Sequence, residues 1–226
     1  MQGKIVLVTG AKGGLGSFVT ERFLADGATV VGASRSIKQS DFPNPRFTAM
    51  AVDFSNASAV RTMVDQIISR FGKVDVLAHI MGGFAASMIG ETDEKTWMEL
   101  LELNLTSAFH ALRAVIPHMR KAKYGRIVAV GSLAATEPHA GLGPYVVSKT
   151  ALATLIQTAA LENADANITA NVVLPGTMDT LTNRASMPNA DFSKWLKPVD
   201  VASLIRTLAD ENAGLINGTL VPIQAH

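Results

Sequence analysis

The chain has 226 residues and a mass of 23.9 kDa, enough for one substantial hydrophobic core and short for two, so we expect a single domain over 1–226. Lys and Arg number 20 against 19 Asp and Glu, a near-neutral balance that argues against nucleic acid or an anionic membrane as a partner. The lack of cysteine excludes disulfides and cysteine-bound metals, and no run has signal-peptide or membrane-spanning character. We therefore expect a cytoplasmic protein that acts on a small-molecule substrate, without a metal site.

Short apolar runs rich in Val, Ile and Ala alternate with longer segments of helical periodicity. Strands are predicted, in chain order, at 4–9, 28–34, 46–52, 74–80, 125–131, 168–174 and 218–223. Helices are predicted between them, at 15–26, 57–71, 94–122, 144–163 and 198–210. The strands are apolar on both faces, as they are when helices cover both sides of a parallel sheet. We predict a Rossmann-like, doubly wound α/β fold with a seven-stranded, mostly parallel sheet between two helical layers.

A glycine-rich segment, TGAKGGLGS, follows the first predicted strand. Gly10, Gly14 and Gly16 have the spacing G-x-x-x-G-x-G, with Leu15 at the start of the next helix. Glycine permits a tight turn and close approach of a pyrophosphate, and the free N–H groups at a helix start attract the anion. A ligand-free turn is the alternative, but the position after the first strand favours dinucleotide binding.

The next two strand ends bear on which dinucleotide binds. The second strand ends in Ser34 and Arg35, with no carboxylate to bind the adenosine ribose of NAD. A guanidinium pairs with phosphate, and Lys12 adds a second positive charge, so NADP(H) is favoured over NAD(H); two solvated surface cations are the alternative. Asp53, with Phe54 beside it, is expected to bond the adenine amino group or to cap the following helix.

A phenol and an ammonium begin the helix after the fifth strand. Tyr145 and Lys149 are four residues apart and share a helix face, and Ser132 ends the preceding strand. The ammonium and the positive ring of an oxidised nicotinamide would lower the pKa of the phenol from about 10. Tyr145 is thus predicted to transfer a proton to the reacting oxygen or nitrogen, and Ser132 to hydrogen-bond it. A half-buried face with a snorkelling lysine is the alternative.

Together, TGAKGGLG, Asp53, Asn104 in LELNLTSAF, Ser132, the Y-x-x-x-K pair and PGTMDT resemble the short-chain dehydrogenase/reductase family over nearly the whole chain. The resemblance implies that Asn104 holds a water in a proton relay to Lys149, and that Lys149 also bonds the nicotinamide ribose. From the residue alone, the favoured interpretation of Asn104 is a side chain that bonds the backbone inside a long helix.

The resemblance also assigns the segment that follows the sixth strand. It implies that the backbone after Pro175, at Gly176 and Met178, and the hydroxyl of Thr180 contact the carboxamide and phosphates of the cofactor. The irregular segment 175–198 is predicted to be a substrate loop, because long loops in compact domains are usually lids or binding loops.

One departure from the family pattern follows the fourth strand. The family usually has Asn-Asn-Ala-Gly there, whereas this chain has His79, Ile80, Met81 and Gly82. The first Asn normally stabilises the sheet, so His79 is predicted to be a satisfied structural residue rather than a base. Gly82 is expected to let the backbone approach the cofactor.

The loop from Asp179 to Trp195 resembles, more narrowly, that of dihydropteridine reductases. Those enzymes usually lack the serine found here as Ser132 and favour NADH, whereas Arg35 points to NADPH, so a ketone or aldehyde substrate is a serious rival to a quinonoid pterin. The loop's Met and aromatic side chains either cover a flat substrate or pack the loop onto the domain; they are Met178, Met187, Phe192 and Trp195. Asp179 is expected to pair with Arg184.

The sequence therefore favours an NADP(H)-dependent oxidoreductase. The alternative is a redox sensor that binds the dinucleotide without turning it over. The apolar surfaces of the helices near 94–122 and 144–163 predict a homodimer or homotetramer.

Overall fold

The computed structural model describes residues 1–225 and contains a seven-stranded sheet. The strand order is β3-β2-β1-β4-β5-β6-β7, and every strand pair is parallel. The strands are β1 (Ile5–Thr9), β2 (Thr29–Ser34), β3 (Phe47–Ala51), β4 (Val76–His79), β5 (Gly125–Val130), β6 (Ile168–Pro175) and β7 (Leu220–Ile223). The predicted doubly wound α/β fold is confirmed, and the order reverses direction between β1 and β4.

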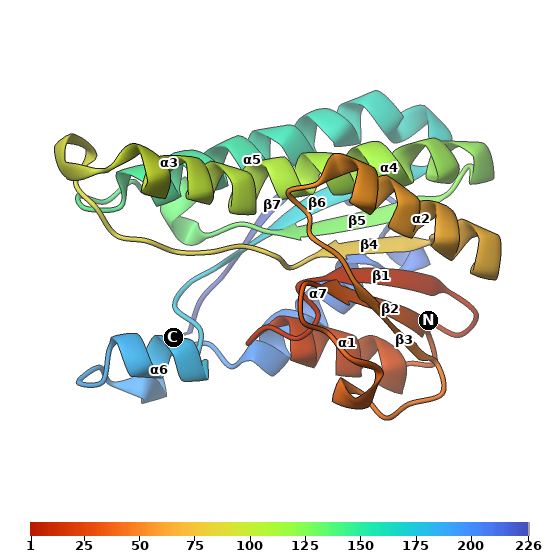
Figure 1. Ribbon diagram of the computed structural model, residues 1–226, viewed down its shortest axis with the longest axis horizontal. Helices are drawn as coiled ribbons and strands as arrows, with labels where there is room; N and C mark the ends of the chain where they lie inside the picture. The colour runs from red at the N-terminus through yellow and green to blue at the C-terminus, as the bar shows by residue number, and fades with distance from the viewer. Residues whose placement is uncertain (226) are drawn as a thin grey trace.

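Helices cover both faces of the sheet (Figure 1). One face carries α1 (Gly16–Ala25) and α7 (Pro198–Leu208), and the other carries α2 (Ala57–Phe71), α4 (Ser107–Ala122) and α5 (Gly143–Asn163). Each face has its own hydrophobic core, and β1 supplies both: Ile5 and Leu7 belong to one, Val6 and Val8 to the other. This two-sided burial explains the unbroken apolar run of the strand.

The helix predicted over 94–122 is two helices joined by a wider turn. α3 (Glu94–Leu101) passes through a π-helical turn, Glu102–Thr106, into α4. At this turn the Ser107 hydroxyl donates to the Leu103 carbonyl at 2.7 Å, and the Asn104 side chain is turned fully inward. The extra residue of a π-turn is a local irregularity often found at functional sites, and periodicity does not reveal it.

The substrate loop is more ordered than predicted. It contains a short helix, α6 (Leu181–Ser186), whose first N–H groups are capped when the Thr180 hydroxyl accepts from Asn183 N at 3.2 Å. A 3₁₀ turn follows at Phe192–Lys194. The prediction of an irregular segment is wrong here, because six residues give too little periodicity to be recognised.

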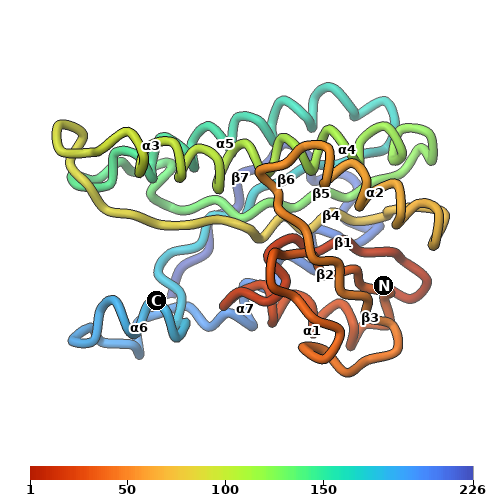
Figure 2. Tube along the Cα trace, in the orientation of Figure 1, coloured from red at the N-terminus to blue at the C-terminus, as the bar shows by residue number. Residues whose placement is uncertain are grey.

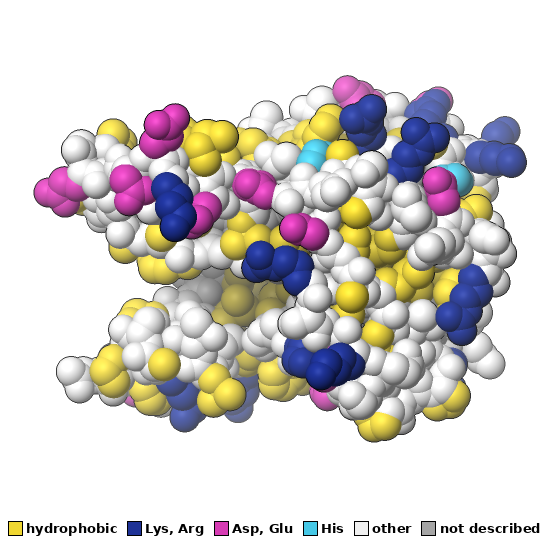
Figure 3. All heavy atoms as spheres, viewed as in Figure 1, with side chains coloured by type: hydrophobic (Ala, Val, Ile, Leu, Met, Phe, Trp, Pro, Cys, Tyr) yellow, Lys and Arg dark blue, Asp and Glu magenta, His cyan; other side chains and the backbone are white. Residues whose placement is uncertain are grey.

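A cleft opens where the strands end. Because all strands are parallel, their carboxyl ends meet at one edge of the sheet. The traces in Figures 1 and 2 place α6 and the segment before α3 on opposite sides of this edge, and the surface between them is deeply hollowed (Figure 3). Within residues 1–225 no helix combines the length and apolar character needed to cross a membrane.

Candidate active site

The glycine-rich turn is so tight that its glycine positions leave no room for a side chain. Gly10 has φ +67°, a conformation that favours glycine. A Cβ on Gly16 would lie 2.0 Å from the Gly10 carbonyl oxygen. Gly13 N donates to that same oxygen at 2.9 Å, and α1 begins immediately afterwards. The turn therefore presents bare backbone and a helix N-terminus, which suit a pyrophosphate.

The segment after β6 returns to this turn. The Thr180 Cβ and Cγ2 lie 3.1 Å from the position a Cβ on Gly14 would take. Gly176 N donates to the Ile223 carbonyl at 2.9 Å, and the Met178 carbonyl accepts from Asn183 Nδ2 at 2.8 Å. Pro175 is the last residue of β6. The residues assigned to the cofactor from opposite ends of the chain are therefore neighbours.

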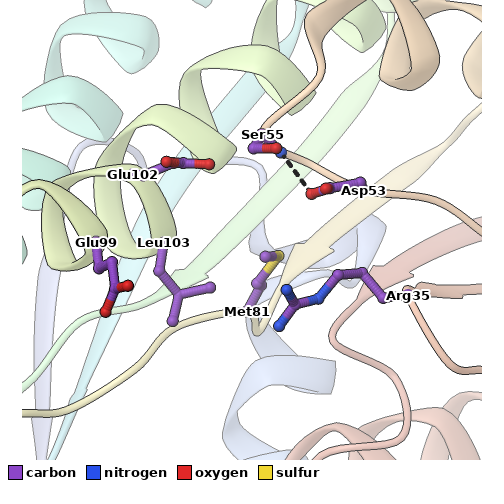
Figure 4. A pocket seen from close by; sticks show the side chains of 7 residues that line it. All are labelled: Arg35, Asp53, Ser55, Met81, Glu99, Glu102 and Leu103. Atoms are coloured by element: carbon purple, nitrogen blue, oxygen red, sulfur yellow. Dashed lines mark hydrogen bonds between the residues drawn. The ribbon is translucent and has the colours of Figure 1, made fainter. Parts of the chain in front are cut away.

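A pocket of ≈ 410 Å³ lies beside the ends of β2 and β3 (Figure 4). Its lining residues are Arg35, Asp53, Ser55, Met81, Glu99, Glu102 and Leu103. The guanidinium of Arg35 extends toward the middle of the pocket, beside Met81 (Figure 4). The Ser34 hydroxyl oxygen is buried and has no hydrogen-bond partner within the described residues. Ser34 does not line the pocket, so the guanidinium of Arg35 is the group there that suits an adenosine phosphate.

Asp53 faces this pocket, and one of its two predicted roles is excluded. Its Oδ1 accepts from Ser55 N at 3.0 Å, and this bond, aided by the charge of Arg35, holds the pKa of Asp53 below its usual value. The cap of α2 is Asn56, whose Oδ1 accepts from Ala59 N, so the capping alternative for Asp53 is wrong. Phe54 is fully buried, which leaves only its backbone to meet a ligand.

Lys12 and Leu15 are less available to a ligand than their place in the glycine-rich segment suggests. The Lys12 ammonium lies 3.0 Å from a carboxylate oxygen of Asp41, so part of its charge is already compensated within the protein. Leu15 is buried, and only its backbone can contribute to the anion site. The pairing with Asp41 was not predictable from the sequence, because the two residues belong to separate segments that only the fold brings together.

The proposed acid/base pair lies at the end of β5 and the start of α5. Ser132 follows β5, and its Oγ accepts from Ala134 N at 3.3 Å. Burial raises the pKa of Tyr145, and the nearby side chain of Ser132 opposes this shift. The lowering expected from Lys149 is therefore wrong: desolvation of the phenolate is the largest cause of the shift, and Lys149 does not contribute to it. Its second predicted contributor, the positive nicotinamide ring, belongs to the bound state.

Lys149 is buried with only 4% of its surface exposed. Its Nζ donates to the Val130 carbonyl at 2.9 Å, and burial lowers the pKa of Lys149 to about 8. A lysine in this state holds a proton near neutral pH and releases it in mildly alkaline solution, a property suited to a proton relay.

Asn104 joins the loop after β4 to α5. Its Oδ1 accepts from Gly83 N at 2.8 Å, and its Nδ2 donates to the Gly83 carbonyl at 3.0 Å and to Ser148 Oγ at 2.9 Å. A Cβ on Gly82 would lie 2.8 Å from both Asn104 Oδ1 and Lys149 Nζ. Gly82 is thus required to leave space between these two polar atoms, and its expected approach to the cofactor stays a prediction.

His79 is buried and bonded at both ring nitrogens, as predicted for a structural residue. Nδ1 lies 3.0 Å from Thr9 Oγ1 and Nε2 lies 3.4 Å from Ser107 Oγ. Because Ser107 donates to the Leu103 carbonyl, it accepts from Nε2–H, and Nδ1 accepts from Thr9. Burial, reinforced by the charge of Lys149, lowers the pKa of His79 to about 3.

Two residues at the site were not identified from the sequence. Ser148 is fully buried, accepts from Asn104 and donates to the Tyr145 carbonyl at 2.8 Å. Phe84 packs its ring on that of Tyr145 with centroids 4.9 Å apart. The available signals were a small polar residue next to Lys149 and an aromatic residue after the Gly-Gly pair.

Several side chains of the substrate loop contact one another. Phe192 packs on Trp195 with ring centroids 4.7 Å apart, and Arg184 lies over the same Phe192 ring. The predicted Asp179–Arg184 pair is confirmed, with Nη2 to Oδ2 at 2.8 Å. Phe192 and Trp195 therefore pack against other residues of the same loop. Met187 is 40% exposed and is not held in this cluster.

Comparison with known proteins agrees with this arrangement. The family model for short chain dehydrogenases matches residues 4–191. The chain is 31% identical to the 3-oxoacyl-[acyl-carrier-protein] reductase of Escherichia coli, over 96% of this chain and 94% of the relative. It is 28% identical to the reductase of the same name from Haemophilus influenzae, over 99% and 97%.

Two solved structures share the fold. ElxO with NADP bound has a TM-score of 0.92 and 26% identity, covering 99% of this chain and 97% of its own. The gox2181 structure also has a TM-score of 0.92, at 23% identity over 99% and 95%. The fold and site define a dinucleotide-dependent α/β oxidoreductase. More narrowly, the chain belongs to the short-chain dehydrogenase/reductase family and is an NAD(P)H-dependent oxidoreductase of that type.

The neutral state of His79 predicts a specific acid lability. Unfolding returns the pKa from about 3 to 6.5, so the unfolded chain takes up the proton first and stability falls as pH drops below 6.5. The loss is expected to reach about 2 kcal/mol between pH ~7.5 and pH ~5. Urea unfolding of the wild type and His79→Asn at both pH values checks this: the variant should lose about 2 kcal/mol less. An equal loss in both proteins would contradict it.

Proposed function

We propose that this protein uses NADPH to reduce a carbonyl group of a small organic substrate, acting as a single unit over residues 1–226. The observation that carries the proposal is the grouping of Ser132, Tyr145 and Lys149 at the strand edge where the glycine turn opens. Residues 175–180, which return to that turn, support a cofactor site beside this group.

Bound NADPH would supply the hydride that adds to the carbonyl carbon. As the carbonyl π bond breaks, Tyr145 donates its hydroxyl proton to the oxygen, and the products are the alcohol and NADP⁺. Ser132 donates a hydrogen bond to the same oxygen, where negative charge develops. Lys149 then returns a proton to Tyr145. Solvent replaces the proton on Lys149 through the space beside Gly82 and Asn104 Oδ1. The raised pKa of Tyr145 suits this direction, because the phenol stays protonated as a general acid.

The preference for NADPH rests on the residues at the end of β2. Arg35 faces the pocket beside Asp53 and Met81, and the buried Ser34 hydroxyl lacks a partner within the described chain. The guanidinium suits a 2′-phosphate on the adenosine ribose, and the backbone of Ser34 is the part of that residue proposed to contact the cofactor. The NADP-bound ElxO structure supports the same cofactor by analogy.

The relatives suggest 3-oxoacyl thioesters as one substrate class. The resemblance of the substrate loop to that of dihydropteridine reductases suggests quinonoid pterins as another. Ser132 favours a substrate whose reacting atom is a carbonyl oxygen. We further propose that the protein works in the cytoplasm.

Turnover assays test the activity. We expect NADPH, and NADH less efficiently, to be oxidised with at least one member of a panel of acetoacetyl thioester, small ketones and quinonoid dihydropterin. Tyr145→Phe should lower kcat about 10²- to 10⁴-fold because the proton donor is lost. Tyr124→Phe is the matched control, since the Tyr124 hydroxyl is buried without a partner in the described chain. Tight NADPH binding without oxidation by any substrate would instead indicate a redox sensor.

The pH dependence of kcat/KM tests the relay. Because burial lowers the pKa of Lys149 to about 8, its ammonium is lost as pH rises through that value. We expect kcat/KM for reduction to fall above pH ~8, by up to about tenfold for each unit. Lys149→Arg keeps its charge throughout this range and should lose that limb, even if less active. If a folded Lys149→Arg protein shows the same fall of kcat/KM above pH ~8, the titrating group is a residue other than Lys149.

We also propose a homodimer or homotetramer formed through the outer faces of α4 and α5. Large apolar side chains are exposed there, with Phe109 at 45%, Val147 at 43% and Leu161 at 82%. Two-fold packing of such faces removes apolar surface from water. Multi-angle light scattering should give two or four times the 23.9 kDa chain mass. A mass of one chain at about 50 μM would dispose of the proposal.

A further inference from the structure

Phe84 contacts the proposed proton donor while most of its own ring faces solvent. Its side chain is 65% exposed. The ring centroid lies 4.9 Å from that of Tyr145, and the planes are inclined by 70°, an edge-to-face arrangement. A large apolar ring left in water gains nothing for stability. Its contact with Tyr145 places this exposed apolar surface beside the reacting atoms.

The backbone on both sides of Phe84 is anchored to catalytic elements. On one side, Asn104 bonds both the N–H and the carbonyl of Gly83. On the other, Ser87 N donates to the Gly141 carbonyl at 2.7 Å, four residues before Tyr145. The ring is thus held by the same contacts that fix Asn104 and the start of α5, rather than by a free loop.

The segment that carries Phe84 has no charged side chain. Residues 81–90, MGGFAASMIG, contain no ionisable side chain. Met88 and Ile89 are 52% and 77% exposed and line a second pocket of ≈ 260 Å³, with Gly90, His139, Ala140, Gly141 and Gly143. The Ile89 side chain lies against Gly143, two residues before Tyr145. An apolar strip therefore runs from the tyrosine toward the mouth of the cleft.

We propose that Phe84 is an aromatic wall of the substrate site, and that the substrate is a planar, uncharged aryl or conjugated carbonyl compound. The inference rests on the proposed function, which puts the carbonyl oxygen within hydrogen-bond reach of Tyr145. A substituent on that carbonyl then lies within reach of a ring packed on Tyr145. Its flat face packs on Phe84, because aromatic pairs gain specific stabilisation at centroid separations of roughly 4.5–7 Å.

A purely local role for Phe84 makes a different prediction. If the ring only shielded Tyr145 from water, replacing it would alter the reactivity of the phenol and affect every substrate by the same factor. A substrate wall instead changes the ratio between flat and non-flat substrates. The two roles are therefore separated by selectivity rather than by activity.

The test compares acetophenone with cyclohexyl methyl ketone, which differ in the planarity of the ring. With NADPH, the wild type should favour acetophenone, and Phe84→Leu should lower kcat/KM for acetophenone about three- to tenfold while changing the cyclohexyl ketone less than about twofold. Phe84→Tyr should keep the aryl preference. Phe18→Leu, at a surface phenylalanine on α1 that is 39% exposed, should leave both values unchanged.

Equilibrium binding gives a readout that does not require hydride transfer. Calorimetric titration of both ketones into each protein saturated with NADP⁺ should show the same selective loss for acetophenone in Phe84→Leu. If the wild type binds acetophenone through Phe84 but reduces neither ketone nor any member of the panel above, the aromatic wall stands and the proposed function fails. Equal factors for both ketones in Phe84→Leu, or no aryl preference in wild-type binding, would overturn the wall.

Discussion

The arrangement of the site depends on the hydrogen bonds of one buried side chain, the amide of Asn104. Its nitrogen donates to the Gly83 carbonyl and to Ser148, and its oxygen accepts from Gly83 N, so three segments meet at one side chain. Leaving such groups unpaired in the interior costs about 1–3 kcal/mol each, which makes this geometry strongly preferred. The π-turn exists at the point where this side chain must turn inward, and the loop bearing Phe84 starts from the glycine that it holds.

The site maintains buried ionisable groups at a cost to stability. Lys149 and His79 lie close enough for the charge of the lysine to help lower the pKa of the histidine. Only one of the two can be charged without severe repulsion in a medium of low dielectric constant. Neutral His79, held between Thr9 and Ser107, therefore makes it possible for Lys149 to hold a proton near neutral pH. His79 thus leaves this position uncharged, as the asparagine usual in the family would.

Much of the fold and of the candidate site was predictable from local sequence. The apolar runs predicted all seven strands, because strands covered on both faces have no polar alternation to obscure them. The glycine spacing and the Tyr145–Lys149 pair were recognisable because their geometry follows from a turn and one helical turn. Two features escaped: α6 is too short to show periodicity, and the π-turn before α4 is set by a side chain whose partners are distant in sequence.

The sequence by itself thus determined the order of strands and helices, the glycine turn and the identities of the candidate groups. Only the tertiary structure decided how those groups ionise and what else they touch. It paired Lys12 with Asp41, buried Lys149 against the Val130 carbonyl and placed the Phe84 ring on Tyr145. The physical reason is that desolvation and contact depend on atoms from segments far apart in the chain. Spacing along the sequence carries no information about the water excluded when those segments pack.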